Sequence, residues 1–121
     1  MKRFKTSAAL LIAATSLPLA VQADNVKRIK KESDFNAIVV GKKLKRNGSW
    51  IRIKADGSQD GRVDGKKFVS KWVWSKRMYC RNAVFGDKAL GTDCLVVSAN
   101  DDGVEFIRNE GKGQVSFWTF D

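Results

Sequence analysis

The segment FVSKWVWSKRMYCR, residues 68–81, holds two of the four tryptophans, the only tyrosine and one of the two cysteines. Side chains alternate between the two faces of a strand. The residues that share one face here are Phe68, Ser70, Trp72 and Trp74. Two indoles on one face bury a large apolar area, at about 25 cal/mol per Å². The segment therefore predicts a central strand, a turn at residues 75–77 and a second strand that begins at Met78.

The second strand of this hairpin carries the first cysteine, with Tyr79 and Arg81 on one face and Cys80 on the other. Cys80 and Cys94 are the only cysteines, so their pairing leaves no choice of connectivity. A disulfide between them closes a loop of about 15 residues, which the chain-entropy description values at roughly 3 kcal/mol. The alternative is a redox or nucleophilic thiol, but the chain has no C-x-x-C pair and no histidine. We therefore expect a structural disulfide.

Short alternating segments separated by glycine-containing turns run from residue 42 to the end of the chain. Pairs such as Asn47-Gly48 and Asp64-Gly65 supply the positive φ angles that tight hairpins require. No helical pattern separates the segments, so the sequence predicts an all-β antiparallel meander of about eight strands, folded as a small barrel or a sandwich. The predicted strands are Lys43–Arg46, Trp50–Ala55, Gly61–Val63, Lys67–Trp74, Met78–Val84, Asp93–Ala99, Val104–Arg108 and Gln114–Phe120.

The whole chain divides into three predicted segments. Residues 1–23 have the basic start, short apolar run and small-x-small cleavage pattern of a signal peptide. The apolar run is too short to span a membrane. We therefore expect export to the periplasm or the medium, where disulfides persist. We also expect the protein to be a monomer. Residues 24–31 predict a flexible basic arm. Residues 32–121 predict a single β-rich domain that opens with one short helix capped by Ser33 and ended by Gly41.

Charge is unevenly distributed along the chain. Residues 24–81 carry 17 basic and six acidic side chains, whereas residues 82–121 carry three basic and seven acidic ones. Cations that surround an aromatic side chain can bind an anionic glycan, lipid headgroup, nucleic acid strand or protein. A basic edge strand that resists pairing with other chains is the alternative. The candidate binding residues are Lys42, Lys43, Lys45, Arg46, Trp50, Arg52, Lys54 and Arg81.

Two acidic patterns are weaker candidates for chemistry. Residues 56–67 match a calcium-binding loop at several positions, but Lys67 replaces the glutamate required at its last position. The pairs Asp101 with Asp102 and Glu105 with Glu110 could act as general acid and base in a small hydrolase. No histidine is present for a zinc site or a serine hydrolase. We therefore expect no metal and no cofactor.

A series of short motifs runs along the chain in a fixed order. The motifs are Gly41-Lys42-x-Leu44, Asp56-Gly57 with Gly61, Trp72-x-Trp74, Tyr79-Cys80-Arg81, Asp93-Cys94 and Gly111-x-Gly113. This order resembles a family of small exported bacterial proteins of unknown function, and the resemblance implies an exported, disulfide-linked β domain. Some members of that family are labelled dihydrodipicolinate reductase, but this chain has no G-x-G-x-x-G after a strand and is too short for a dinucleotide-binding domain.

These observations predict a non-enzymatic binding domain that holds an anionic partner on a surface or at a barrel mouth. A protein-interaction module, such as an inhibitor of an envelope enzyme, is a second hypothesis. A small carboxylate-dependent hydrolase is a third.

Overall fold

The segment at residues 68–81 forms the central hairpin of a β-sheet. In the computed structural model, which describes residues 25–121, the hairpin joins β5 (Lys66–Ser75) to β6 (Met78–Phe85). Trp72 lies opposite Arg81, and Trp74 lies opposite Tyr79. The predicted alternation of β5 is confirmed, because Phe68, Ser70 and Trp72 are buried whereas Lys71 and Val73 are exposed. The turn residues Lys76 and Arg77 both have positive φ, 53° and 66°, as a two-residue hairpin of this twist requires.

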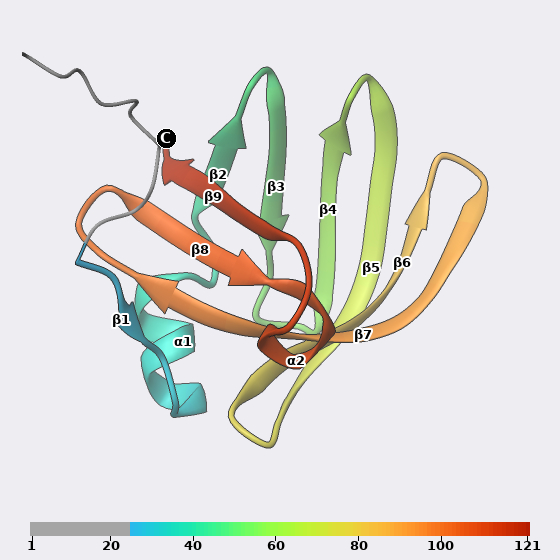
Figure 1. Cartoon of the computed structure of the whole chain (residues 1–121). Helices are drawn as coiled ribbons and strands as arrows, with labels where there is room; N and C mark the ends of the chain where they lie inside the picture. Colours follow the sequence, from blue (N-terminus) through green and yellow to red (C-terminus); the bar gives the residue numbers. More distant parts are fainter. Residues whose placement is uncertain (1–24) are drawn as a thin grey trace, which may run out of the picture.

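Eight antiparallel strands close into a barrel (Figure 1). Each strand pairs with its neighbour in the chain, and the first and last strands of the meander pair through Leu44 and Phe120. The predicted all-β meander is therefore confirmed, as a barrel and not a sandwich. Closure leaves few unpaired strand edges. The other strands are β2 (Lys43–Arg46), β3 (Ser49–Ile53), β4 (Ser58–Val63), β7 (Lys88–Ala99), β8 (Gly103–Ile107) and β9 (Val115–Phe120).

β7 is longer than the sequence predicted, and it has two sets of partners. Its first part, up to Leu95, pairs with β6, and residues 96–99 pair with β8. The last two residues of β7 also pair with the short strand β1 (Lys27–Arg28). The prediction of a flexible arm is corrected here, because Ile29 is only 4% exposed and its N–H donates to the Val97 carbonyl at 2.8 Å. The predicted signal peptide lies outside the described residues.

A short helix of seven residues, about two turns, covers one end of the barrel. This helix is α1 (Glu32–Ile38). The predicted Ser33 cap is wrong: the N-cap is Lys31, two residues earlier, and its side chain makes no capping hydrogen bond. Phe35 is fully buried, and its ring lies 5.3 Å from the ring of Trp72 and 5.5 Å from that of Tyr79. A helix this short depends on such docking. Among residues 25–121, no helix is long and apolar enough to cross a membrane.

The other end of the barrel carries the turns between β2 and β3, β4 and β5, and β6 and β7, because successive connections of a meander alternate between ends. The connection between β8 and β9 lies at the same end and contains α2 (Arg108–Gly111). Asn109 and Glu110 in α2 have left-handed backbone angles, so it is a tight turn and not a regular helix. In Figure 1 the β2–β3 and β4–β5 hairpins rise at the top, while α1 lies at the lower left.

The predicted disulfide is confirmed. Cys80 and Cys94 are directly opposite each other on β6 and β7, with a Cα–Cα distance of 3.9 Å. The neighbouring pairs, Tyr79 with Leu95 and Arg81 with Asp93, project to the opposite face because side chains alternate. The disulfide thus fixes the register that aims these four side chains toward the barrel interior.

Candidate functional site

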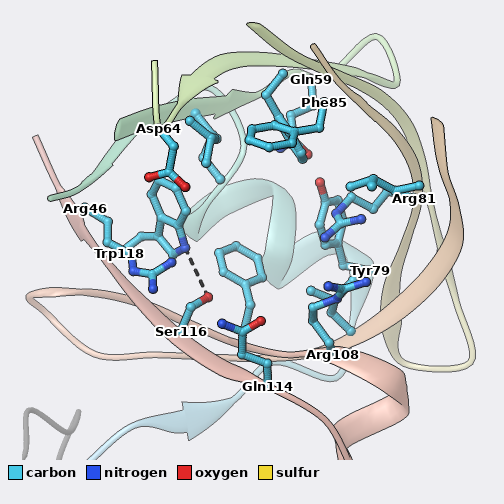
Figure 2. A pocket seen from close by; sticks show the side chains of 16 residues that line it. Arg46, Gln59, Asp64, Tyr79, Arg81, Phe85, Arg108, Gln114, Ser116 and Trp118 are labelled. Atoms are coloured by element: carbon cyan, nitrogen blue, oxygen red, sulfur yellow. Dashed lines mark hydrogen bonds between the residues drawn. The ribbon is translucent and has the colours of Figure 1, made fainter. Parts of the chain in front are cut away.

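The interior of the barrel contains a cavity of about 330 Å³ that is partly open to solvent (Figure 2). Its volume falls at the lower end of the range for small-molecule sites in proteins. The apolar side chains that line it are Ile51, Val63, Phe68, Phe85, Leu90, Leu95, Phe106 and Trp118. The polar ones are Arg46, Gln59, Asp64, Tyr79, Arg81, Arg108, Gln114 and Ser116.

Tyr79 lies at the closed end of this cavity, between Phe35 of α1 and Phe106 of β8. Its side chain is 1% exposed, and its hydroxyl has no hydrogen-bond partner among the described residues. The nearby Ser70 hydroxyl donates instead to Gln59 Oε1, at 3.3 Å. Burial raises the pKa of Tyr79, against the smaller opposing effects of the positive charge on Arg81 and of the neighbouring Ser70 hydroxyl. The hydroxyl is therefore neutral and available to donate a hydrogen bond into the cavity.

Arg81 follows Tyr79 by two residues on the same face of β6, one step closer to the open end. Its guanidinium lies 5.7 Å from the centre of the Phe68 ring. Its Nη1 atom is buried and has no hydrogen-bond partner among residues 25–121. Burial lowers the pKa of Arg81, and the positive charge of Arg108 adds to this effect, while Tyr79 and Asp93 oppose it. An arginine still keeps its charge in a protein, so this cation is only partly compensated.

The carboxylate closest in register to Arg81 is already used by other groups. Asp93 accepts a hydrogen bond from Arg108 Nε at 2.8 Å through one oxygen, and from the Asn109 N–H at 3.0 Å through the other. These contacts attach α2 to β7 at the rim of the cavity. Asp93 therefore balances Arg108, and Arg81 has no direct ion pair within residues 25–121.

The opposite side of the cavity carries Arg46, Asp64 and Trp118 (Figure 2). The Arg46 guanidinium lies 5.6 Å from the Trp118 ring, within the range of a cation–π contact. Trp118 Nε1 donates to Ser116 Oγ at 3.2 Å. This side therefore contains one cation, one anion and an aromatic surface whose polar atom has a partner.

The eight candidate binding residues fall into three groups: four lie on the outer face of the barrel, two have structural partners and two line the cavity. Lys43, Lys45, Trp50 and Arg52 lie together on the outer face of β2 and β3, where Lys43 pairs with Arg52 and Lys45 with Trp50 across the strands. Lys43 Nζ lies 5.1 Å from the Trp50 ring, and Lys45 forms an ion pair with Asp121 at 3.2 Å.

Two of the other candidates have structural partners, and two lie inside the barrel. Lys42 Nζ donates to the Ile38 carbonyl at 2.7 Å and so caps α1, and Lys54 pairs with Asp60 at 2.8 Å. Arg46 and Arg81 both line the cavity. The predicted continuous region from Lys42 to Lys54 is thus divided by the alternation of the strands.

The acidic patterns do not converge. In the part of the chain that the structure describes, no group of three or more acidic or cysteine side chains could hold a metal ion. In the calcium-like loop, Asp56 accepts hydrogen bonds from the backbone and hydroxyl of Ser58, while Asp60 pairs with Lys54. The hydrolase candidates Asp101, Asp102, Glu105 and Glu110 do not line the barrel cavity.

Sequence reasoning missed Tyr79, Arg108, Asp64 and Trp118 as site residues. A signal for Tyr79 was present, because the alternation that points Arg81 inward also points Tyr79 inward. No local signal identifies Arg108, because its contact with Asp93 depends on the pairing of β7 with β8 and on the tight turn of α2.

Comparison with known proteins found no relative of this chain. No protein-family description matches the chain. No curated protein and no solved structure matches it.

Proposed function

We propose that this chain is a non-enzymatic binding domain that takes a small, partly apolar molecule into the barrel cavity. The observation that carries the proposal is the pair of polar groups in the cavity wall, the Tyr79 hydroxyl and Arg81 Nη1, that have no partner within the described residues. Buried polar groups in native proteins nearly always have partners. Two such atoms beside one open cavity are therefore explained by a bound molecule.

The other walls of the cavity support the same function. Small-molecule sites are concave and mostly apolar, with a few polar groups that orient the ligand. Here aromatic rings from four strands, Phe68, Phe85, Phe106 and Trp118, surround the polar groups of Tyr79 and Arg81. The disulfide on the other face of β6 and β7 holds the strands that carry those polar groups. Rigid support of this kind lowers the entropic cost of binding.

A fluorescent probe that is uncharged and apolar, N-phenyl-1-naphthylamine, tests the proposal. We expect its emission to rise on binding to the native protein. Ser116 projects into the cavity, so Ser116→Phe should fill part of it and weaken probe binding at least tenfold. Thr119→Phe is the matched control, because Thr119 lies on the outer face of the same strand and also makes one side-chain hydrogen bond, to the Lys45 carbonyl at 3.3 Å.

The two substitutions should have different effects on probe binding if the proposal is right. Equal weakening by both variants, or unchanged binding in folded Ser116→Phe, would show that the probe binds elsewhere. Circular dichroism and urea unfolding of both variants establish that each is folded.

Export is part of this proposal. A disulfide persists in an oxidising compartment, and the N-terminal sequence pattern predicts secretion to the periplasm or the medium. The resemblance to small exported bacterial proteins remains a prediction of the same kind. Detection of the chain without residues 1–23 in the periplasmic or extracellular fraction, with no free thiol, is the expected result.

The outer basic face supports a second candidate function, contact with an anionic polymer. Its supporting observation is the cluster of Lys43, Lys45 and Arg52 around Trp50 on one face of the barrel. Binding to heparin beads that persists at high salt would contradict a charge-driven contact, because salt screens exposed charges. No described feature favours the inhibitor or hydrolase hypotheses over these two.

A further inference from the structure

We propose that the ligand of the cavity is an apolar molecule with a single carboxylate, which Arg81 and the Tyr79 hydroxyl bind together. This inference rests on the proposed function, that the cavity takes a small molecule, and it names the chemical class of that molecule.

An anion is the partner that these two groups lack. The Tyr79 hydroxyl can donate one hydrogen bond, and Arg81 Nη1 is a buried donor without an acceptor among residues 25–121. A guanidinium presents its donors in a planar fork that matches a carboxylate through two parallel hydrogen bonds. Burial lowers the pKa of Arg81, and a bound anion would offset the cost of burying its charge. Both groups lie on the same face of β6, two residues apart, so one carboxylate can reach both.

The balance of charges around the cavity points to one negative charge on the ligand. Arg108 is paired with Asp93 at 2.8 Å. Arg46 and Asp64 lie on the same side of the cavity in Figure 2 and contribute opposite charges. Arg81 is the remaining ionised group of the lining, with Phe68 beneath it. A monoanion would neutralise this one charge, whereas a dianion such as a phosphate monoester would bring an excess negative charge into the barrel.

The remaining walls indicate the body of the ligand. Tyr79 is at the end that α1 covers, and β6 runs from there toward the open end, where Phe85 and Leu90 line the cavity. A carboxylate held by Tyr79 and Arg81 therefore leaves the rest of the molecule to extend along apolar side chains toward the opening. This arrangement fits an aliphatic or aromatic monocarboxylic acid.

Calorimetric titration with octanoate and with 1-octanol separates the carboxylate from the apolar chain. We expect the native protein to bind octanoate about 10- to 100-fold more tightly than octanol, the range for hydrogen bonds to a charged group. Arg81→Gln should remove most of this preference, because it should weaken octanoate binding much more than octanol binding. Arg52→Gln, which removes an arginine from the outer face, should keep the full preference. Octyl phosphate, as a dianion, should bind no more tightly than octanoate.

The possible results distinguish the two proposals. Equal affinity for octanoate and octanol, or a preference that Arg81→Gln leaves intact, would overturn the carboxylate site while cavity binding stands. Octyl phosphate binding tenfold more tightly than octanoate would also overturn it. If neither compound binds nor displaces N-phenyl-1-naphthylamine, the proposed function itself fails. Tyr79→Phe provides a second variant if Arg81→Gln does not fold, and it should lower the preference for octanoate severalfold.

Discussion

Replacing Arg81 with methionine should make the ligand-free protein more stable. The guanidinium of Arg81 has one buried nitrogen without a partner in the part of the chain that the structure describes, and an unsatisfied buried donor costs about 1–3 kcal/mol. Its contact with the Phe68 ring, at 5.7 Å, offsets about 0.5–1 kcal/mol of that cost. Methionine keeps an unbranched side chain that can pack on the same ring. We therefore expect Arg81→Met to raise the free energy of unfolding by about 1 kcal/mol, which corresponds to about 4–8 °C in the melting temperature.

Urea unfolding at neutral pH, without reductant and without ligand, measures this difference as a shift of the midpoint at constant slope. Arg108→Met is the matched control, because Arg108 also lines the cavity but is paired with Asp93 at 2.8 Å. That variant removes the charged partner of a carboxylate that is 16% exposed, so we expect a loss of about 1–3 kcal/mol. A loss of 1 kcal/mol or more in Arg81→Met, at a magnitude similar to the control, would refute the reasoning that Arg81 is kept for binding at a cost in stability.

Three further predictions concern the barrel and its closed end. Cys80→Ser should lower the free energy of unfolding by roughly 2–5 kcal/mol, measured in urea, and two free thiols in the native protein would contradict the disulfide. Gly61→Ala should lower it by roughly 1–3 kcal/mol, because a Cβ atom there would lie 2.8 Å from the Ile51 Cα and clash with the Trp50 carbonyl; an unchanged midpoint would count against this packing. Tyr79 is the only tyrosine, and burial raises its pKa in the folded state above the unfolded value of about 10. Stability should therefore be complete below pH about 10 and fall as the pH rises above it, because the unfolded chain releases the proton more readily. Ultraviolet absorbance should show tyrosinate only as the protein unfolds, and an ordinary titration in the folded state would refute the burial of Tyr79.

The strands could be predicted from the sequence because their ends carry local signals. Turn pairs such as Asn47-Gly48 and Asp64-Gly65 adopt the positive φ angles that their residue types favour. The first half of β7 was missed, since residues 88–92 contain a glycine and few apolar side chains and are held by pairing with β6. β1 was missed for a similar reason: its two residues are basic and exposed, and it is ordered by pairing with β7 and by burial of Ile29. A short segment that is ordered by pairing with a neighbouring strand need not carry a periodic pattern of its own.

The candidate site could be predicted only in part. Arg81 was identified from its position beside the disulfide, and the structure brings it into the cavity. The basic region was treated as one surface, although alternation along β2 sends Lys43 and Lys45 outward and Arg46 inward. The loss of an available carboxylate beside Arg81 depends on Arg108, which reaches Asp93 only when β8 pairs with β7. The uncompensated charge of Arg81 thus arises only in the folded protein. The sequence shows the charged residues but not which of them pair.

The most direct measurement of the central claim is a nuclear magnetic resonance titration of the indole N–H signals with octanoate. Trp118 lines the cavity and Trp50 lies on the outer basic face, so one spectrum reports on both surfaces. We expect a saturable shift of the Trp118 signal while the Trp50 signal stays in place. A shift of Trp50 with Trp118 unchanged would show that anions bind outside the barrel and not in its cavity.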